Sequence, residues 1–208
     1  LKSYNDALAI FKDLGRKKGC ATVYHNIGNC YFEKGDYKNA MEYYKISASI
    51  KKELNLIKKM GATLNNIGET FLKMNQLDSA EIFFRQSLNI MTEKGDKFYS
   101  IYSLSSLLEG YFVRKNYIVS VEFLKKAEKL AIEIKSKGER ADLYRSFSKT
   151  YKAMGNFNLA LDYHERYTLL HDSIFNEDKS KEMGRMEGKF DTEKKISEEK
   201  IRKNLYPV

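Results

Sequence analysis

The chain has 208 residues, of which 42% are hydrophobic and 31% are charged, and its single proline is the penultimate residue, Pro207. This composition suits one elongated, mostly helical domain with a continuous apolar core, and nothing in it points to a more specialised class. The net charge of +9 raises a nucleic acid or an acidic membrane surface as a partner. However, the 29 lysines and 8 arginines are scattered along the chain, which excludes a basic binding stripe.

The sequence repeats with a strict period of 40 residues. Gly28 and Gly68 lie one period apart, and Leu108 and Ser148 continue their column. Three residues later there is an unbroken aromatic column, Tyr31, Phe71, Tyr111 and Tyr151. A column of small residues follows, Ala40, Ala80, Ser120 and Ala160. A fixed period without insertions indicates identical units stacked on one another.

These units divide the chain in order into an array over residues 1–172. The first residues align with the second half of a unit, so residues 1–14 are predicted to form the second helix of a truncated repeat. Complete repeats are then expected at about 20–54, 60–94, 100–135 and 140–172.

One unit shows how each repeat is built. Leu64, Ile67 and Phe71 have the three-and-four spacing of one helix face, and Asn75 breaks the pattern where a helix end needs positive φ. The helical spacing resumes at Leu77. Small residues in the Gly68 and Ala80 columns let the two helices approach closely, so each unit is predicted to be a helical hairpin.

The first complete unit carries a family resemblance. Its residues 26–31, then Gly35, Asp36, Tyr37, Ala40 and Tyr44, resemble a tetratricopeptide repeat. The resemblance covers residues 1 to about 171 and implies an all-α, right-handed superhelical solenoid of antiparallel helix pairs. The departures are Leu108 and Ser148 in the glycine column and Ser120 and Val121 in place of the expected alanine pair, and they predict looser packing of the third full unit. The long period leaves room for the longer helices of peptide-binding members.

The residues from 173 to 208 do not repeat and are expected to form a C-terminal cap and a charged exit helix. Met183, Met186 and Phe190 have the spacing of a first-type helix and are predicted to dock on Leu161 and Leu170 as a cap. The charged run over 191–203 has opposite charges three and four residues apart. Such a helix either faces solvent or connects to another segment, and a role in self-association is a further possibility.

The tail also carries a resemblance. Residues 172–183 and 189–195 resemble the exit segment of bacterial sensor proteins, in which a tetratricopeptide array precedes a coiled coil, often a membrane span, and then a histidine kinase, a helix-turn-helix regulator or a nucleotide cyclase. This resemblance implies the input region of a membrane-anchored signalling protein, with a periplasmic array and with the membrane contacted only through segments outside this fragment. The alternatives are a cytoplasmic receptor resembling Gram-positive quorum-sensing regulators, or a structural adaptor.

Such a solenoid has a concave groove lined by the first helix of each pair. The side chains predicted to face it are His25, Asn26, Asn29, Asn65, Asn66, Glu69, Ser105, Ser106, Glu109, Arg145, Ser146 and Lys149. Because an asparagine carries both a donor and an acceptor, Asn26 and Asn66 are candidates for holding the backbone of an extended peptide. The alternative is that these two side chains only bridge adjacent helices.

The predicted groove is polarised along its length. Glu69 and Glu109 occupy its middle, whereas Arg145 and Lys149 occupy its C-terminal end, which favours a peptide with a basic centre and a terminal carboxylate. An ion pair between Glu109 and Arg145 is the alternative. Two acids against two bases do not favour nucleic acid on this face.

The sequence offers no catalytic, metal or cofactor site. The three histidines are His25, His164 and His171, and no histidine or cysteine pair has metal-ligand spacing. A glycine-rich phosphate loop and a nucleophile with an adjacent base are not evident either. The chain is therefore predicted to be a non-catalytic module that binds a protein or a peptide.

Overall fold

The computed structural model describes the backbone of residues 1–205 and the side chains of residues 1–196. Within this part the chain forms nine α-helices and no strand, which confirms the all-α prediction. The helices are α1 (Lys2–Asp13), α2 (Lys17–Glu33), α3 (Tyr37–Glu53), α4 (Ile57–Lys73), α5 (Leu77–Glu93), α6 (Lys97–Val113), α7 (Tyr117–Glu133), α8 (Lys137–Ala153) and α9 (Phe157–Leu205).

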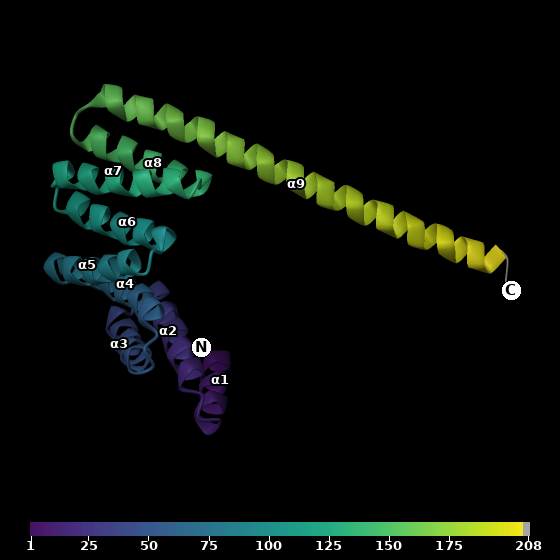
Figure 1. Cartoon of the computed structure of the whole chain (residues 1–208), viewed down its shortest axis with the longest axis horizontal. Coiled ribbons are helices and arrows are strands. Elements are labelled where there is room, and N and C mark those ends of the chain that lie inside the picture. The colour runs from purple at the N-terminus through teal and green to yellow at the C-terminus, as the bar shows by residue number, and fades with distance from the viewer. Residues whose placement is uncertain (206–208) are drawn as a thin grey trace.

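The helices stack in chain order into a solenoid (Figure 1). In each pair the first helix packs against the second: α2 on α3, α4 on α5, α6 on α7, and α8 on α9. Each of α3, α5 and α7 also packs against the first helix of the following pair. Consecutive hairpins therefore bury one another's apolar faces, as the period predicts.

The turns recur as regularly as the helices. A residue with positive φ follows each helix from α1 to α8 at a spacing of 20 residues: Gly15, Gly35, Asn55, Asn75, Gly95, Lys115, Lys135 and Gly155. The next N–H then bonds back into the helix, as where Asp36 N donates to Tyr31 O at 3.0 Å. The residue that follows the turn in some units, such as Asp36 or Asp96, caps the next helix through its side chain.

Close contact between the two helices of a unit depends on glycine. A Cβ atom on Gly28 would lie 2.6 Å from the Tyr44 ring, and one on Gly68 would lie 2.5 Å from the Phe84 ring. In the third unit the same two columns hold Leu108 and Leu124, and both are buried. Leu108 thus fits in the glycine column because the facing residue, Leu124, is smaller than the aromatic ring of the other units.

The third unit lies within the largest apolar cluster of the described residues, which runs from α5 to α8. Ser120, whose column otherwise holds alanine, donates from Oγ to the carbonyl of Leu108 at 3.0 Å. Ser148 makes the matching bond to the carbonyl of Ala160 at 2.8 Å. The expectation of looser packing in the third full unit is therefore not met: Leu108, Ser120, Val121 and Leu124 are all buried, because the facing side chain is smaller and the serine hydroxyl is hydrogen-bonded.

Helix α9 differs from the prediction for the tail. It continues without a break across residue 172, and its later part extends away from the stack (Figure 1). Met183, Met186 and Phe190 are all exposed, as is Leu161, so the prediction that they dock as a cap is wrong. The physical reason is that no turn follows residue 172, and a straight helix cannot fold back on its own start. The side chains from 197 on, including much of the predicted charged run, lie outside the described residues.

None of the helices, as far as the structure describes them, combines the length and the apolar character that a membrane-spanning segment requires.

Candidate functional site

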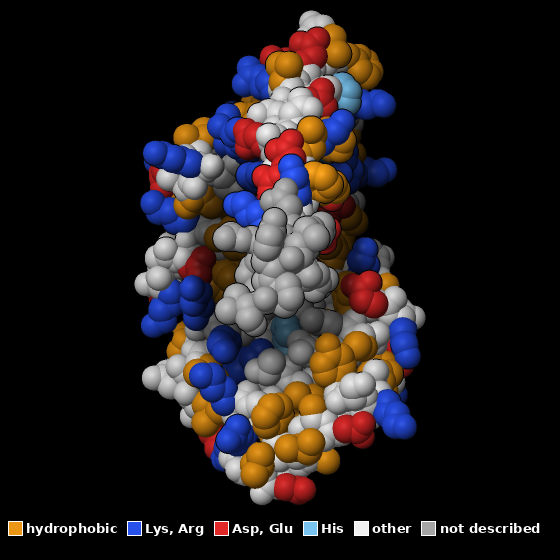
Figure 2. Space-filling model, turned by 90° about the vertical axis from the view of Figure 1, so that its right-hand side faces the viewer, with side chains coloured by type: hydrophobic (Ala, Val, Ile, Leu, Met, Phe, Trp, Pro, Cys, Tyr) orange, Lys and Arg blue, Asp and Glu red, His pale blue; other side chains and the backbone are white. Residues whose placement is uncertain are grey.

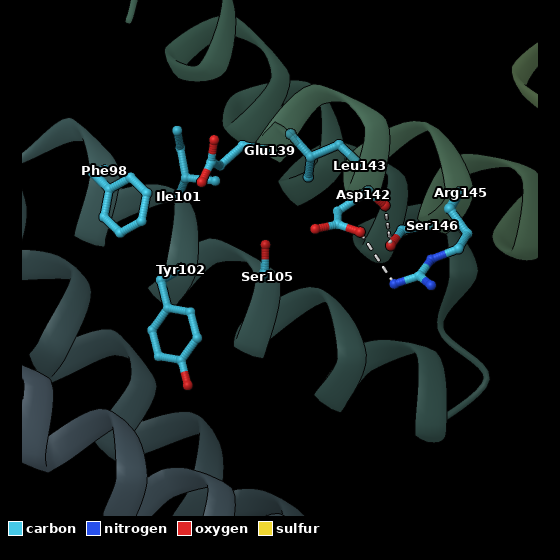
Figure 3. Close-up of a pocket in the computed structure, with 9 residues that line it drawn as sticks. All are labelled: Phe98, Ile101, Tyr102, Ser105, Glu139, Asp142, Leu143, Arg145 and Ser146. Carbon is cyan, nitrogen blue, oxygen red and sulfur yellow. Dashed lines mark hydrogen bonds and ion pairs between the residues drawn. The ribbon is translucent and has the colours of Figure 1, made fainter. Parts of the chain in front are cut away.

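Three adjoining hollows lie along the first helices of successive pairs, and together we call them the inner groove. The first, of about 340 Å³, is lined by Phe32, Glu69, Leu72, Lys73, Tyr102, Ser105, Ser106 and Glu109. The second, of about 310 Å³, is lined by Phe98, Ile101, Tyr102, Ser105, Glu139, Asp142, Leu143, Arg145 and Ser146 (Figure 3). The third, also of about 310 Å³, is lined by Leu108, Glu109, Phe112, Arg145, Ser146, Lys149 and Thr150.

The hollows share lining residues and therefore lie next to one another. Tyr102 and Ser105 line the first and the second, Glu109 lines the first and the third, and Arg145 lines the second and the third. The groove thus runs over α4, α6 and α8, with Phe32 of α2 at its edge. The predicted groove residues that meet along it are Glu69, Ser105, Ser106, Glu109, Arg145, Ser146 and Lys149.

The asparagines of α2 and α4 join these helices to each other. Asn66 Nδ2 donates to Asn29 Oδ1 at 3.1 Å, and Tyr44 Oη donates to the same oxygen at 2.7 Å. Asn26 is half-buried and has no hydrogen bond to another side chain among residues 1–196. Asn66 therefore bridges α2 and α4 through Asn29, as the alternative interpretation expects, whereas Asn26 forms no such bridge to any described side chain.

His25 lies in a polar cluster beneath the surface. Its Nδ1 is 3.2 Å from Thr63 Oγ1, which also accepts a 2.6 Å hydrogen bond from Lys51 Nζ. Burial, and then the charge of Lys51, lower the pKa of His25 from 6.5 to about 4. Burial, and then the charge of Lys59, lower the pKa of Lys51 to about 8. His25 is thus a neutral packing residue at pH 7 and lines none of the three hollows.

Asn65 holds the carboxylate of Glu69 from below. It has 0% exposure, and its Nδ2 donates to Ser106 Oγ at 3.0 Å and to Glu69 Oε1 at 3.3 Å. Tyr102 Oη donates to the same Glu69 oxygen at 2.8 Å. Burial raises the pKa of Glu69 above its usual range, and the hydrogen bonds from Tyr102 and Ser106 oppose part of this shift. The Glu69 carboxylate is therefore occupied by hydrogen bonds that join α4 to α6.

At the C-terminal end of the groove, charges pair off. Lys149 Nζ lies 3.4 Å from the carboxylate of Glu109 and 4.1 Å from the centre of the Phe112 ring. Arg145 pairs with Asp142 of its own helix at 3.2 Å. The ion pair of Glu109 thus involves Lys149 and not Arg145, and the end predicted to be basic also holds two carboxylates, Asp142 and Glu139.

The apolar walls of the groove are formed by residues that the repeat pattern does not predict to face it. Phe98 and Tyr102 of α6 are exposed and line the second hollow. Positions 98, 102, 105 and 109 share one helix face, so extending that face from Ser105 by two turns toward the N-terminus finds both rings. The same extension from Arg145 finds Asp142.

The described residues include no group of three or more histidine, cysteine, aspartate or glutamate side chains that could hold a metal ion. His171 lies beside Asp172 on the surface of α9, with 3.8 Å between Nδ1 and Oδ1. His164 is exposed on the same helix, and its ring is tilted relative to that of Tyr167, with 6.2 Å between the ring centroids. What the inner groove offers is hydrogen bonds, aromatic faces and paired charges.

Comparison with known proteins agrees with this architecture. Two family models, both described as tetratricopeptide repeat, match residues 21–51 and 62–90. These segments fall on α2 with α3 and on α4 with α5. The sequence matches none of the curated proteins.

Several solved structures share the fold at low sequence identity. BtubC (BKLC) from P. vanneervenii superimposes with a TM-score of 0.72 and 19% identity, over 82% of this chain and 71% of that one. Aspartyl phosphate phosphatase F from Bacillus subtilis superimposes with a TM-score of 0.78 and 14% identity, over 83% of this chain and 45% of that one. A third structure is a signal transduction ATPase with numerous domains and a tetratricopeptide repeat sensor, from Pyrococcus horikoshii. It superimposes with a TM-score of 0.68 and 19% identity, over 79% of this chain and 26% of that one.

Stacked helical hairpins with a groove on their first helices define the chain as an α-helical repeat protein. The matching family models identify the repeats at residues 21–51 and 62–90 as tetratricopeptide repeats. This fold is one that binds proteins or peptides and is generally non-catalytic.

Proposed function

We propose that this chain binds an extended peptide or protein segment in its inner groove and serves as the sensory or scaffolding input region of a signalling protein. The observation that supports the proposal most is that three hollows with shared lining residues follow one another along α4, α6 and α8. A groove of this shape suits an extended segment better than a compact small molecule. The tetratricopeptide repeat sensor of the Pyrococcus horikoshii ATPase is a neighbour whose role fits the proposal.

The groove supplies what such a ligand needs. The rings of Phe98 and Tyr102 and the buried side chains of Ile101 and Leu143 offer apolar contact. Ser105 and Ser146 offer hydroxyl groups in the same hollow. Because Asn66 already bonds to Asn29, we place the peptide over α6 and α8 and not on the asparagines of α2 and α4.

Helix α9 is the element that carries a signal out of the array in this proposal. It packs on α8 at its start, and a contact between Lys137 and Glu177 fastens it further along. A ligand that bridges α6 and α8 changes the angle between these helices, and α9 follows α8 as one straight rod. We further propose that the later part of α9 pairs with the α9 of a second copy.

Binding is tested by selecting peptides from a random twelve-residue phage library on the immobilised chain and measuring an enriched peptide by calorimetry. Tyr102→Ala is expected to weaken binding at least about tenfold, because it removes a ring shared by two hollows. Ile82→Ala, on an exposed site of α5, is the matched control and leaves the affinity unchanged. A selected peptide that binds both variants as tightly as the wild type contradicts the proposed site.

A further inference from the structure

The second hollow combines apolar walls with carboxylates. On α6, Phe98 is 51% exposed and Tyr102 is 43% exposed, so both rings are open to a ligand. On α8, Glu139 and Asp142 stand across from them (Figure 3). The floor is formed by Ile101, which like Leu143 is buried. The hollow therefore has aromatic faces on one side and negative charge on the other.

The negative charge of this hollow is only partly neutralised. Its charged lining residues are two carboxylates and one guanidinium. Glu139 forms no ion pair with any residue among 1–196, and the pair of Asp142 with Arg145 joins two exposed side chains of one helix. An ion pair between exposed side chains is weak and is readily exchanged for another partner. The chain as a whole carries a net charge of +9, so the excess of carboxylates in this hollow has the opposite sign to the overall charge. The space-filling view shows lysines and arginines interspersed with acidic side chains over the face in view (Figure 2).

We infer that this hollow receives a lysine or arginine side chain of the bound peptide. The aliphatic part of such a side chain lies along Phe98 and Tyr102, and its cationic end reaches Glu139 and Asp142. An apolar side chain fits the walls but leaves Glu139 beside it without a counter-charge. An acidic side chain is repelled. The inference rests on the proposed peptide-binding function and specifies its recognition element.

The inferred position differs from the one that the sequence predicts for a basic residue of the ligand. The sequence places the basic residue against Glu69 and Glu109, but Glu69 accepts from Tyr102 and Asn65, and Glu109 pairs with Lys149. Among the described carboxylates that line the groove, Glu139 is the one without a protein partner. The cationic side chain is therefore expected between α6 and α8, one repeat further along the array.

The hollow is probed directly by NMR on the ¹⁵N-labelled full chain, with small peptides of defined sequence. The probes are three blocked tripeptides, acetyl-Gly-Xaa-Gly-amide, with lysine, norleucine or glutamate as the central residue. The lysine peptide is expected to shift the amides of residues 98–105 and 139–146 and to bind about fivefold more tightly than the norleucine peptide. Equal shifts with all three peptides, or shifts elsewhere in the array, overturn the inference.

A charge-removal variant separates recognition from folding. The double variant Glu139→Gln with Asp142→Asn keeps the size of both side chains and is expected to abolish the preference for lysine over norleucine. Glu122→Gln, an exposed acid on α7, is the control and keeps the preference. If the preference survives in the double variant, the inference is wrong.

The outcome is distinguishable from failure of the proposed function. Library-selected peptides that bind in the groove but tolerate loss of every lysine and arginine overturn the inference and leave the proposed function standing. A lysine tripeptide that shifts the hollow while the library yields no binder supports the cationic site and counts against the groove as an extended peptide site.

Discussion

At the scale of single residues, the close approach of α4 and α5 depends on the absence of a side chain at Gly68. A Cβ there would lie 2.5 Å from the Phe84 ring and 3.2 Å from the carbonyl oxygen of Ala80. Gly68→Ala is therefore expected to lower the free energy of unfolding by about 1–3 kcal/mol. The measurement is the midpoint and slope of urea unfolding.

Gly110 provides the control for this substitution. It lies inside α6, and an added Cβ meets no atom within 4 Å. Gly110→Ala is expected to raise the free energy of unfolding by about 0.5–1 kcal/mol, because alanine is the better helix former. Equal stability of Gly68→Ala and the wild type would show that the two helices are not held by this contact.

His25 gives the stability of the protein a pH dependence. Its pKa is about 4 in the folded chain and 6.5 as a free side chain, so between these values the unfolded chain binds more protons. Stability from this group is present above pH 6.5 and is lost as the pH falls toward 4. His25→Gln is expected to remove about 1–2 kcal/mol of the stability difference between pH 7 and pH 5.

Urea unfolding of both proteins at the two pH values measures this difference. Lys51 and Tyr44 of α3 and Thr63 of α4 lie around the ring, and burial lowers the pKa of Lys51 only to about 8, which is above the pH range of the measurement. An identical loss of stability in the wild type and in His25→Gln would mean that the ring is accessible to water and to protons in the folded chain.

The sequence predicts the face of each first helix but not the depth of every side chain on it. Asn65 and Asn66 are adjacent, and a helix turns by about 100° per residue. One is therefore fully buried under Glu69, whereas the other bonds to Asn29. The pattern of one unit cannot distinguish these cases, because the neighbouring unit decides which side chains it covers.

At the scale of elements, the sequence predicts the helices from α2 to α8 and their turns well. The positive φ expected at Asn75 is present, and Gly35 and Gly155 adopt it at the equivalent turns. Lys115 and Lys135 adopt the same conformation although lysine does not favour it. Position in the repeat, and not residue type alone, thus sets the backbone at these turns.

Helix α9 is the element for which sequence reasoning failed in part. Its apolar spacing at Met183, Met186 and Phe190 indicated burial within the same chain, yet residues 175–196 are all exposed. Periodicity identifies an apolar stripe but not the molecule that covers it. Gly184 and Gly188 each weaken an isolated helix by about 1 kcal/mol, so this part of α9 gains most from pairing.

Pairing of α9 predicts a concentration-dependent dimer in sedimentation equilibrium. Phe190 is 68% exposed, and Phe190→Glu is expected to weaken the dimer at least about tenfold, because it places a charge in the apolar stripe. Thr192→Glu makes the same change of charge on the other side of the helix and leaves the dimer intact. A monomer for the wild type over the whole concentration range would contradict the pairing.

At the scale of the whole molecule, the period of 40 residues predicts the stacking of hairpins and therefore the fold. It also predicts that the first helices share one face. It does not predict the distribution of hollows, because their walls come from single aromatic residues such as Phe98 and Tyr102 that have no counterpart in the other units. The walls of the groove are therefore formed by residues that differ from their counterparts in the other units.

The central claim is that this shared face of α4, α6 and α8 receives a peptide. It is tested most directly by cross-linking a library-selected peptide, carrying a photoreactive phenylalanine analogue, to the wild-type chain and mapping the products by mass spectrometry. The account predicts cross-links within residues 98–112 and 139–149. Cross-links on α3, α5, α7 or α9 would contradict it.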